Sequence, residues 1–211
     1  MPRGGVLPDS FDALVASAAA LAARPGRALL GIAGAPASGK STLAEQLVAA
    51  LGDDAVLVPM DGFHLDDEVL RRHGSWERKG AIDTFDDAGF AELLHRLRAA
   101  GGTVYAPRFD RALEASIGGA IEVAPHVPLV VTEGNYLLAD TGAWPIARAA
   151  LDEVWFLRIH PEIRRNRLIA RHIRFGRSPA EARARADGTD ETNARLIQAT
   201  APRADRVVDG A

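Results

Sequence analysis

The chain has 211 residues, of which 47% are hydrophobic and 25% are charged, so it can bury a sizeable core and is not disordered as a whole. Its 25 basic and 28 acidic residues give a net charge of −3, which excludes a whole-molecule electrostatic attraction to nucleic acid or to an anionic membrane surface. The absence of cysteine excludes disulfides and thiolate metal sites and suits a reducing compartment, so we expect a cytoplasmic protein.

The first expected element is a helix over 10–23, with Ser10 as its cap and Pro25 as its stop. Its apolar residues recur at helical spacing: Phe11, Leu14, Val15, Ala18 and Leu21. A signal peptide is the alternative, but the segment has no marked basic region and carries Asp9 and Asp12 at its head. No apolar run approaches the roughly 20 residues that span a bilayer, so we expect no membrane partner.

Further along, short apolar runs alternate with helical patterns. Strands are expected at 28–33, 55–60, 129–132, 154–159 and 206–208. Helices are expected at 40–51, 86–99, 143–150, 161–175, 179–187 and 190–199. Continuous apolar strands separated by helices predict an α/β fold, a single domain over 1–211 in three α/β/α layers around a mainly parallel sheet. The Gly-rich residues 101–125 are expected to form an excursion that carries contacts to a substrate.

The segment GAPASGKST follows the first strand and leads into a helix, and it has the spacing G-x-x-x-x-G-K-[ST] of a phosphate-binding loop. Backbone N–H groups and the positive end of the helix can hold phosphate oxygens there. Lys40 would reach the transferring phosphate, and the Ser41 hydroxyl would bind Mg²⁺. We predict a nucleotide site formed by Gly34, Ala35, Pro36, Ala37, Ser38, Gly39, Lys40, Ser41 and Thr42.

The segment VPMDGFHLDD places Asp61 just past the second strand. Ligands of open parallel sheets bind outside the carboxyl ends of the strands. A carboxylate there could accept a proton from a substrate hydroxyl or help to hold Mg²⁺. The alternative is an Asp that only caps a turn with Gly62. His64 is a candidate base by proximity alone.

The segment LVVTEGNYLL contains a third apolar strand, which ends at Glu133. A second acidic residue at this position would bind Mg²⁺ through water and complete the phosphate site. The alternative is an acidic residue that only begins a loop.

The expected helix at 161–175 lies in a strongly basic stretch, which contains nine arginines from Arg158 to Arg185 inclusive. Arg164, Arg167, Arg171 and Arg174 share one helical face. Near a triphosphate, Arg171 and Arg174 would act as a lid that neutralises the moving phosphoryl group, whereas Arg164 would be structural or solvated. A solvated basic face and a nucleic-acid-binding stripe are the alternatives.

Several segments occur in an order that resembles a known family: GAPASGKST, MDGFH, RKGAIDTFD, PRFDRALE, EGNYLL and RLIARHIRFG. Over residues 10–208, the chain resembles the P-loop kinases of the uridine kinase, pantothenate kinase and phosphoribulokinase family. It is most similar to a bacterial branch labelled fructose transport system kinase or nucleoside/nucleotide kinase-like. The later segments GTDETNARLI and PRADRVV fit the same pattern.

The resemblance implies a P-loop NTPase fold with an Arg-rich helical lid over 161–188. It implies transfer of the γ-phosphoryl group of ATP, with Mg²⁺, to a hydroxyl of a small metabolite. The implied catalytic residues are Lys40, Asp61 (the base) and Arg171. Ser41 and Glu133 would hold Mg²⁺. The implied nucleotide contacts beyond the loop are Arg171, Arg174 and Asp205, the last beside the adenine.

The resemblance also implies which residues bind the acceptor. They are Asp61, His64, Asp83, Arg108, Asp110, Arg111, Asn135 and Tyr136. The segment PRFDRALE lacks the Tyr-Asp-plus-His pattern of uridine kinases, which argues against a pyrimidine nucleoside as the acceptor.

Two other functions remain open on sequence alone. One is an ATP-binding regulatory switch of a transport system, which would need neither Asp61 nor an acceptor pocket. The other is a nucleic-acid-associated NTPase that uses the Arg-rich helix. A GTPase is excluded because no guanine-reading N-K-x-D occurs: lysine is found only at 40 and 79. We expect a small-molecule partner and no nucleic acid, and the sequence does not decide between a monomer and a homodimer.

Overall fold

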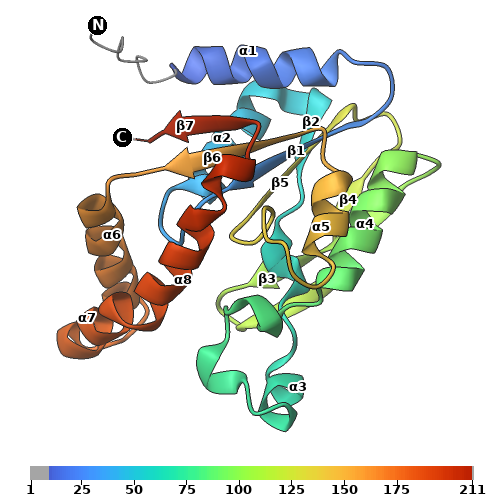
Figure 1. Ribbon diagram of the computed structural model, residues 1–211. Coiled ribbons are helices and arrows are strands. Elements are labelled where there is room, and N and C mark those ends of the chain that lie inside the picture. The colour runs from blue at the N-terminus through green and yellow to red at the C-terminus, as the bar shows by residue number, and fades with distance from the viewer. Residues whose placement is uncertain (1–9, 211) are drawn as a thin grey trace, which may run out of the picture.

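The computed structural model describes residues 10–210, so the expected head of the first helix at Asp9 lies outside the described residues. Its centre is a parallel sheet (Figure 1). The strand order is β2 (Ala55–Leu57), β5 (Leu129–Gly134), β1 (Ala28–Ala33), β6 (Glu153–Arg158) and β7 (Arg206–Asp209). β1 is central and pairs in parallel with both β5 and β6. The predicted α/β class with a mainly parallel sheet is confirmed.

The helices of residues 10–210 follow the predicted order, with α3 as an addition that the sequence does not predict. They are α1 (Phe11–Ala22), α2 (Lys40–Leu51), α3 (Asp67–Arg72), α4 (Asp87–Ala99), α5 (Trp144–Ala149), α6 (Pro161–Arg174), α7 (Pro179–Asp187) and α8 (Thr189–Ala199). Short 3₁₀ helices lie at η1 (Gly52–Asp54), η2 (Met60–Phe63), η3 (Trp76–Arg78), η4 (Ile82–Thr84) and η5 (Ala201–Arg203). None of these helices is long and apolar enough to cross a membrane.

Different helices cover the two faces of the sheet, which gives the three predicted layers. One core contains residues of α1 and α2, and the other contains residues of α4, α5 and α8. The alternation along β1 shows the division. Ala28, Leu30 and Ile32 belong to the first core, whereas Leu29 and Ala33 belong to the second. Because successive side chains of a strand point to opposite faces, one continuous apolar run supplies both cores.

The edge strand β2 ends at Leu57, although the sequence suggests a strand up to residue 60. Pro59 has no backbone N–H with which to continue the ladder, so the chain leaves the sheet and turns into η2. This early exit places Asp61 inside a tight turn at the carboxyl edge of the sheet.

Residues 101–125 form a regular excursion, the antiparallel hairpin of β3 (Val104–Asp110) and β4 (Ala115–Val123), in a sheet of its own. The hairpin packs directly on η2, because a Cβ at Gly62 would collide with the carbonyl of Pro107. The glycine therefore lets the hairpin lie against the turn that carries Asp61.

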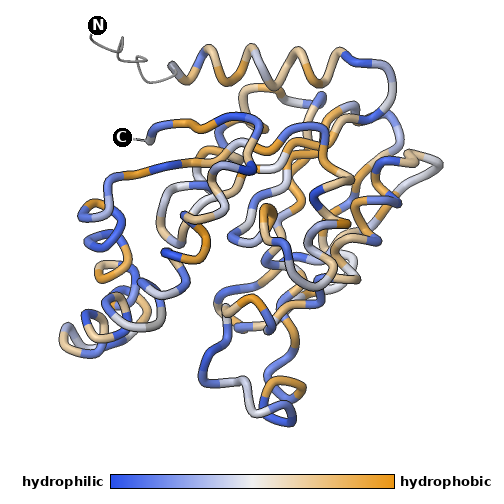
Figure 2. The backbone as a smooth tube through the Cα atoms, viewed as in Figure 1, coloured by the Kyte–Doolittle hydropathy of each residue, from blue (hydrophilic) through white to orange (hydrophobic). Residues whose placement is uncertain are grey.

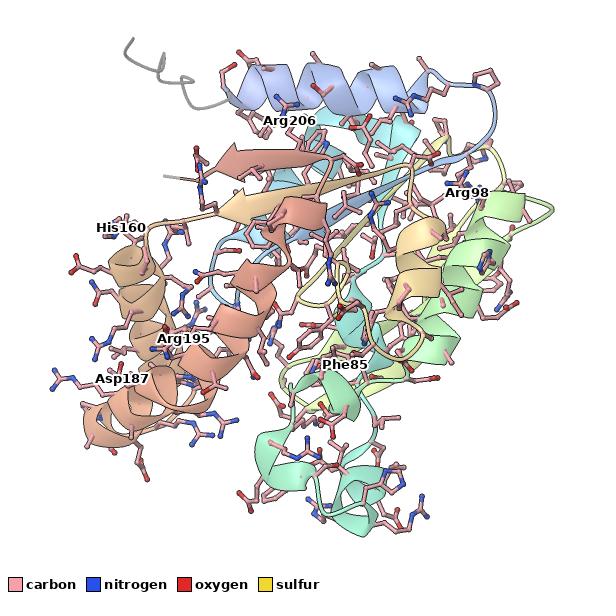
Figure 3. All side chains as sticks on the ribbon, viewed as in Figure 1. Phe85, Arg98, His160, Asp187, Arg195 and Arg206 are labelled. Atoms are coloured by element: carbon pink, nitrogen blue, oxygen red, sulfur yellow. The ribbon has the colours of Figure 1, made fainter. Side chains whose placement is uncertain are left out.

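The lid region 161–188, formed by α6 and α7, leaves the sheet at the end of β6. Figure 3 labels His160 where β6 leads into α6, and Asp187 at the end of the lid remote from the sheet. In Figure 2, hydrophilic residues cover much of α6 and α7, unlike the central strands. Arg165 of α6 binds Asp187 through two hydrogen bonds of 2.6 and 2.7 Å, which holds the two helices together.

Candidate active site

The loop between β1 and α2 is built to bind an anion. Gly39, at the N-terminus of α2, has a φ of 100°, a left-handed conformation that favours glycine. The first N–H groups of α2 have no partner within the helix. The Ser38 hydroxyl is buried, and no hydrogen-bond partner for it lies within residues 10–210. These free donors suit the oxygens of a phosphate group.

Lys40 is the first residue of α2 and is only 7% exposed. Its Nζ donates to Asn135 Oδ1 at 2.9 Å and to the Ala35 carbonyl at 3.2 Å. Burial lowers the pKa of Lys40, while the carboxylates of Glu133 and Asp61 oppose that shift. Two hydrogen bonds therefore hold the ammonium group in place, and the nearby carboxylates favour its charged form.

Ser41 and Glu133 form a pair of hard oxygen ligands beside the loop. The Ser41 hydroxyl donates to Glu133 Oε1 at 3.0 Å, and Glu133 is 6% exposed at the end of β5. Burial, and next the Asp61 carboxylate, raise the pKa of Glu133. Within the described residues, no three acidic, His or Cys side chains are grouped to hold a metal alone. The pair fits Mg²⁺, which takes one or two protein oxygens together with phosphate and water.

Asp61 lies at the centre of the charged groups. Its Oδ2 accepts a hydrogen bond of 2.9 Å from Arg111 Nη2, which comes from the turn of the hairpin. Its charge also acts on Lys40, Glu133 and Arg171. Residues from the phosphate-binding loop, from the end of β5 and from the lid therefore lie around this carboxylate. A carboxylate at this position shares one cavity with the phosphate-binding loop.

An aromatic wall continues from Asp61 away from the loop. The His64 ring lies 4.1 Å from the Phe85 ring and 4.7 Å from the Phe109 ring, measured between centroids. Figure 3 labels Phe85 close to where the projecting segment that contains α3 joins the rest of the protein. His64 Nδ1 is 2.8 Å from the Asp61 carbonyl, and burial lowers the pKa of His64. The wall thus combines flat apolar faces with a polar edge beside the base.

The lid contributes arginines from α6. Arg171 lines the cavity, where burial, and next the charge of Arg111, lower its pKa. Arg167 lies over the loop, since a Cβ at Gly39 would be 3.7 Å from Arg167 Nη1. Arg164 is instead buried between helices, where it pairs with Glu191 of α8. This is the structural role that the sequence suggests for Arg164.

These elements line an open cavity of about 1290 Å³. The predicted site residues that line it are Pro36, Ala37, Ser38, Gly39, Lys40, Ser41, Thr42, Asp61, His64, Arg111, Glu133, Asn135 and Arg171. The structure therefore brings together most of the predicted phosphate, metal and base groups in one continuous space.

Four predicted acceptor residues lie outside this cavity, and three of them, Asp83, Asp110 and Tyr136, form hydrogen bonds or ion pairs elsewhere. Asp83 forms an ion pair with Arg78. Asp110 accepts hydrogen bonds from the N–H groups of the hairpin turn, at 2.9 and 3.1 Å. The Tyr136 hydroxyl donates to the Gly80 carbonyl at 2.7 Å, which ties the segment between η3 and η4 to the end of β5. Their positions favour structural roles over direct acceptor contact.

Other predicted residues are also displaced from the cavity. Arg108 and Arg174 are exposed and do not line it, and Gly34 and Ala35 are buried in the loop behind the lining residues. Asp205 accepts from the Val154 N–H and from Arg148, both at 2.7 Å. Its carboxylate thus joins β6 to α5. Asp205 itself does not line the cavity, whereas Val208, Asp209 and Gly210 do.

Several lining residues are missing from the sequence prediction: Asp67, Lys79, Phe109, His172, Asp190 and Asn193. The sequence could have drawn attention to Lys79, because it is one of only two lysines in an arginine-rich chain. Asp190 and Asn193 belong to the segment GTDETNARLI, which matched the family without a role. Asp190 lies 2.6 Å from His172 Nε2, and this contact joins α8 to the lid.

Comparison with known proteins gives consistent results. No family model matches the chain. It is 38% identical over 145 residues to an ATP-dependent kinase-like protein of Aspergillus versicolor, which covers 64% of this chain and 84% of that protein. It is 34% identical over 202 residues to a protein of Schizosaccharomyces pombe named as a candidate uridine kinase, which covers 90% and 86%.

A solved structure from Silicibacter sp. TM1040, named as a candidate fructose transport system kinase, has a TM-score of 0.86 and 40% identity to this chain. The match covers 94% of this chain and 98% of that one. The relatives are named as kinases, so this chain is a kinase that uses ATP. It belongs to the family of P-loop kinases that contains the uridine kinase-like and pantothenate kinase proteins.

Proposed function

We propose that the protein transfers the γ-phosphoryl group of ATP, bound with Mg²⁺, to a hydroxyl group of a small metabolite. The observation that carries this proposal is the position of Asp61. Its carboxylate shares one cavity with Lys40 and with the Ser41–Glu133 pair, beside an aromatic wall that offers room for a second substrate.

The loop and the lid would hold the nucleotide. The N–H groups around Gly39 and the Ser38 hydroxyl would bind phosphate oxygens, and Lys40 and Arg171 would neutralise charge on the γ-phosphoryl group. Ser41 and Glu133 would hold Mg²⁺. When bound, the ion supplies neutralisation of the phosphate oxygens.

Asp61 would act as the general base. The acceptor oxygen forms a bond to the γ-phosphorus while the bond to the β–γ bridging oxygen breaks, and ADP leaves with that electron pair. The proton of the acceptor hydroxyl passes to the Asp61 carboxylate. Such a base contributes a factor of about 10²–10⁴ to a rate.

The two alternatives have less support. A switch without an acceptor needs neither a carboxylate in front of the phosphate site nor the wall of His64, Phe85 and Phe109. A nucleic-acid-binding stripe needs free, exposed cations along α6, yet Arg164 is buried against Glu191, and Arg165 pairs with Asp187. We infer a cytoplasmic, small-molecule kinase.

A coupled assay of ADP release over a panel of nucleosides, sugars, polyols and pantothenate-like alcohols tests the proposal. We expect ADP formation that depends on one class of acceptor, with an equal amount of phosphorylated acceptor detected by mass spectrometry. The Lys40→Ala variant, with its strongly reduced turnover, serves as the control. Tight ATP binding with no phosphorylated product from any acceptor would instead favour the switch.

A further inference from the structure

Arg111 forms an ion pair with the Asp61 carboxylate, the group that would take the acceptor proton in the proposed reaction. Arg111 lies in the turn of the hairpin, and its Nη2 is 2.9 Å from Asp61 Oδ2. The side chains are 45% and 24% exposed, respectively. An ion pair that solvent reaches this easily contributes little stability, so Arg111 can change its partner at small cost.

The reaction itself removes this partner. When the Asp61 carboxylate takes the proton of the acceptor hydroxyl, it becomes neutral, and Arg111 loses its ion-pair partner. Within the described residues, Asp61 is the only carboxylate that pairs with Arg111. Arg171 faces the same space and is close enough for Arg111 to lower its pKa. The carboxylates of Asp190 and Glu133 still act on Arg171. Arg111 is therefore the guanidinium group that is left without an ion-pair partner.

Lys79 is the other cation beside the aromatic wall. It does not need a charge from the acceptor, because Asp67 already neutralises it. Its Nζ lies 2.6 Å from Asp67 Oδ1 and 2.8 Å from the Glu114 carbonyl. Lys79 is also 5.3 Å from the centre of the Phe109 ring, and that ring stacks against His64. Of these two cations beside Asp61, Lys79 therefore keeps its own partner throughout, and only Arg111 depends on the Asp61 carboxylate.

We propose that the hydroxyl acceptor carries an anionic group, a carboxylate or a phosphate, and that this group takes Arg111 from Asp61 when the acceptor binds. This inference rests on the proposed kinase function and narrows its substrate class. The planar fork of a guanidinium binds either anion through two parallel hydrogen bonds. The exchange does two things at once: it holds the acceptor at the hairpin, and it frees the Asp61 carboxylate to take the proton.

Matched acceptors test the proposal. Glycerol, glycerate and glycerol 3-phosphate form one set, and ribitol, ribonate and ribitol 5-phosphate form another. We expect a carboxylate or a phosphate member to be phosphorylated with a kcat/KM at least about 10-fold above that of its neutral counterpart. The carboxylate and phosphate arms separate the two sources of the anion.

The variant Arg111→Gln should raise KM for the anionic acceptor about 10-fold to 100-fold, because a hydrogen bond to a charged group is lost. KM for ATP should stay the same, and Arg111→Lys should restore part of the acceptor affinity. Arg72→Gln, an exposed change on α3, is the matched control. A fall in kcat for neutral and anionic acceptors alike, at unchanged acceptor KM, would overturn the proposal and assign Arg111 to the phosphoryl group.

A binding measurement separates this inference from the kinase proposal. With Mg²⁺ and a non-hydrolysable ATP analogue present, glycerate or glycerol 3-phosphate should raise the melting temperature of the wild type but not of Arg111→Gln. Phosphorylation of neutral acceptors with no dependence on Arg111 would overturn the inference alone. ATP binding with no product and no Arg111-dependent shift would overturn both.

Discussion

The phosphate end and the acceptor end of the cavity are built in different ways. The phosphate end is one continuous segment, from Gly34 to Thr42, held by backbone geometry at the start of α2. The acceptor end is assembled from η2, the η3–η4 segment and the hairpin, and exposed side-chain ion pairs such as Asp61–Arg111 connect these segments. Backbone groups fixed by a helix are preorganised, whereas exposed ion pairs exchange easily.

The difference suggests a division of labour. A rigid phosphate end suits a cosubstrate that is common to many kinases, whereas an acceptor end made of separate segments can change its specificity by small shifts of any one of them. The division predicts that variants of the two ends have different signatures: those at the phosphate end alter nucleotide binding, and those at the acceptor end do not.

The largest expected effect is that of Asp61→Asn. The amide keeps the shape of the side chain but cannot take the acceptor proton, so turnover should fall by about 10²–10⁴. The affinity for ATP should change little, because the donors around Gly39 do not depend on Asp61. Isothermal titration of ATP beside steady-state kinetics measures both quantities. If nucleotide affinity in Mg²⁺ falls as far as the rate, Asp61 chiefly holds the metal and belongs to the phosphate end.

Lys40→Ala should lower turnover by about 10²–10³, because one fixed positive group at the moving phosphoryl is lost. In contrast to the acceptor-end variant, this change should also weaken ATP binding. The fold should persist, since Lys40 contacts the loop and Asn135 and is not part of the apolar cores. Arg96→Ala on the outer face of α4 is the control. Near-normal turnover in Lys40→Ala would contradict the assignment of the loop.

Arg171 and Arg174 offer a matched pair on one helix. Both side chains are exposed, but Arg171 lines the cavity and Arg174 does not. Arg171→Gln should lower kcat/KM about 10-fold to 100-fold through loss of a charge-assisted hydrogen bond, and Arg174→Gln should change it by less than about 2-fold. Steady-state kinetics of both variants settles the comparison. Equal effects would mean that the lid moves further on closing than the cavity suggests.

The sequence predicted the phosphate end well because its information is local. The spacing of Gly34, Gly39 and Lys40 determines the backbone path, and the apolar strand before it determines its place in the sheet. The positions of the central strands followed for the same reason, apart from β2. That strand ends early because Pro59 cannot donate to the ladder.

The acceptor end was harder to predict because its contacts join distant segments. Residues 101–125 did not suggest a hairpin, since β4 is mostly exposed and contains Gly118 and Gly119, which are unfavourable in strands. Asp205 and Tyr136 have residue types that suit a binding site, but long-range hydrogen bonds to Val154 and Gly80 occupy them. No spacing in the sequence indicates such pairings.

The smallest expected effect is a pH dependence of stability at the acceptor end. Burial lowers the pKa of His64; the charge of Asp61 opposes that shift, and those of Lys79 and Arg111 reinforce it. The folded protein therefore prefers the neutral imidazole. Above about pH 6.5 the ring is neutral in both the folded and the unfolded chain. As the pH falls below that value, the unfolded chain binds the proton first, so the folded state loses stability.

His64→Gln removes this titration and keeps an amide N–H that can reach the Asp61 carbonyl. The free energy of unfolding of the wild type relative to the variant should be constant above about pH 7 and should fall as the pH drops below about 6.5. Urea denaturation at several pH values measures the difference, in which the other titratable groups cancel. A difference that grows as the pH falls would mean that the folded wall stabilises the imidazolium, and that carboxylates outweigh burial at the acceptor end.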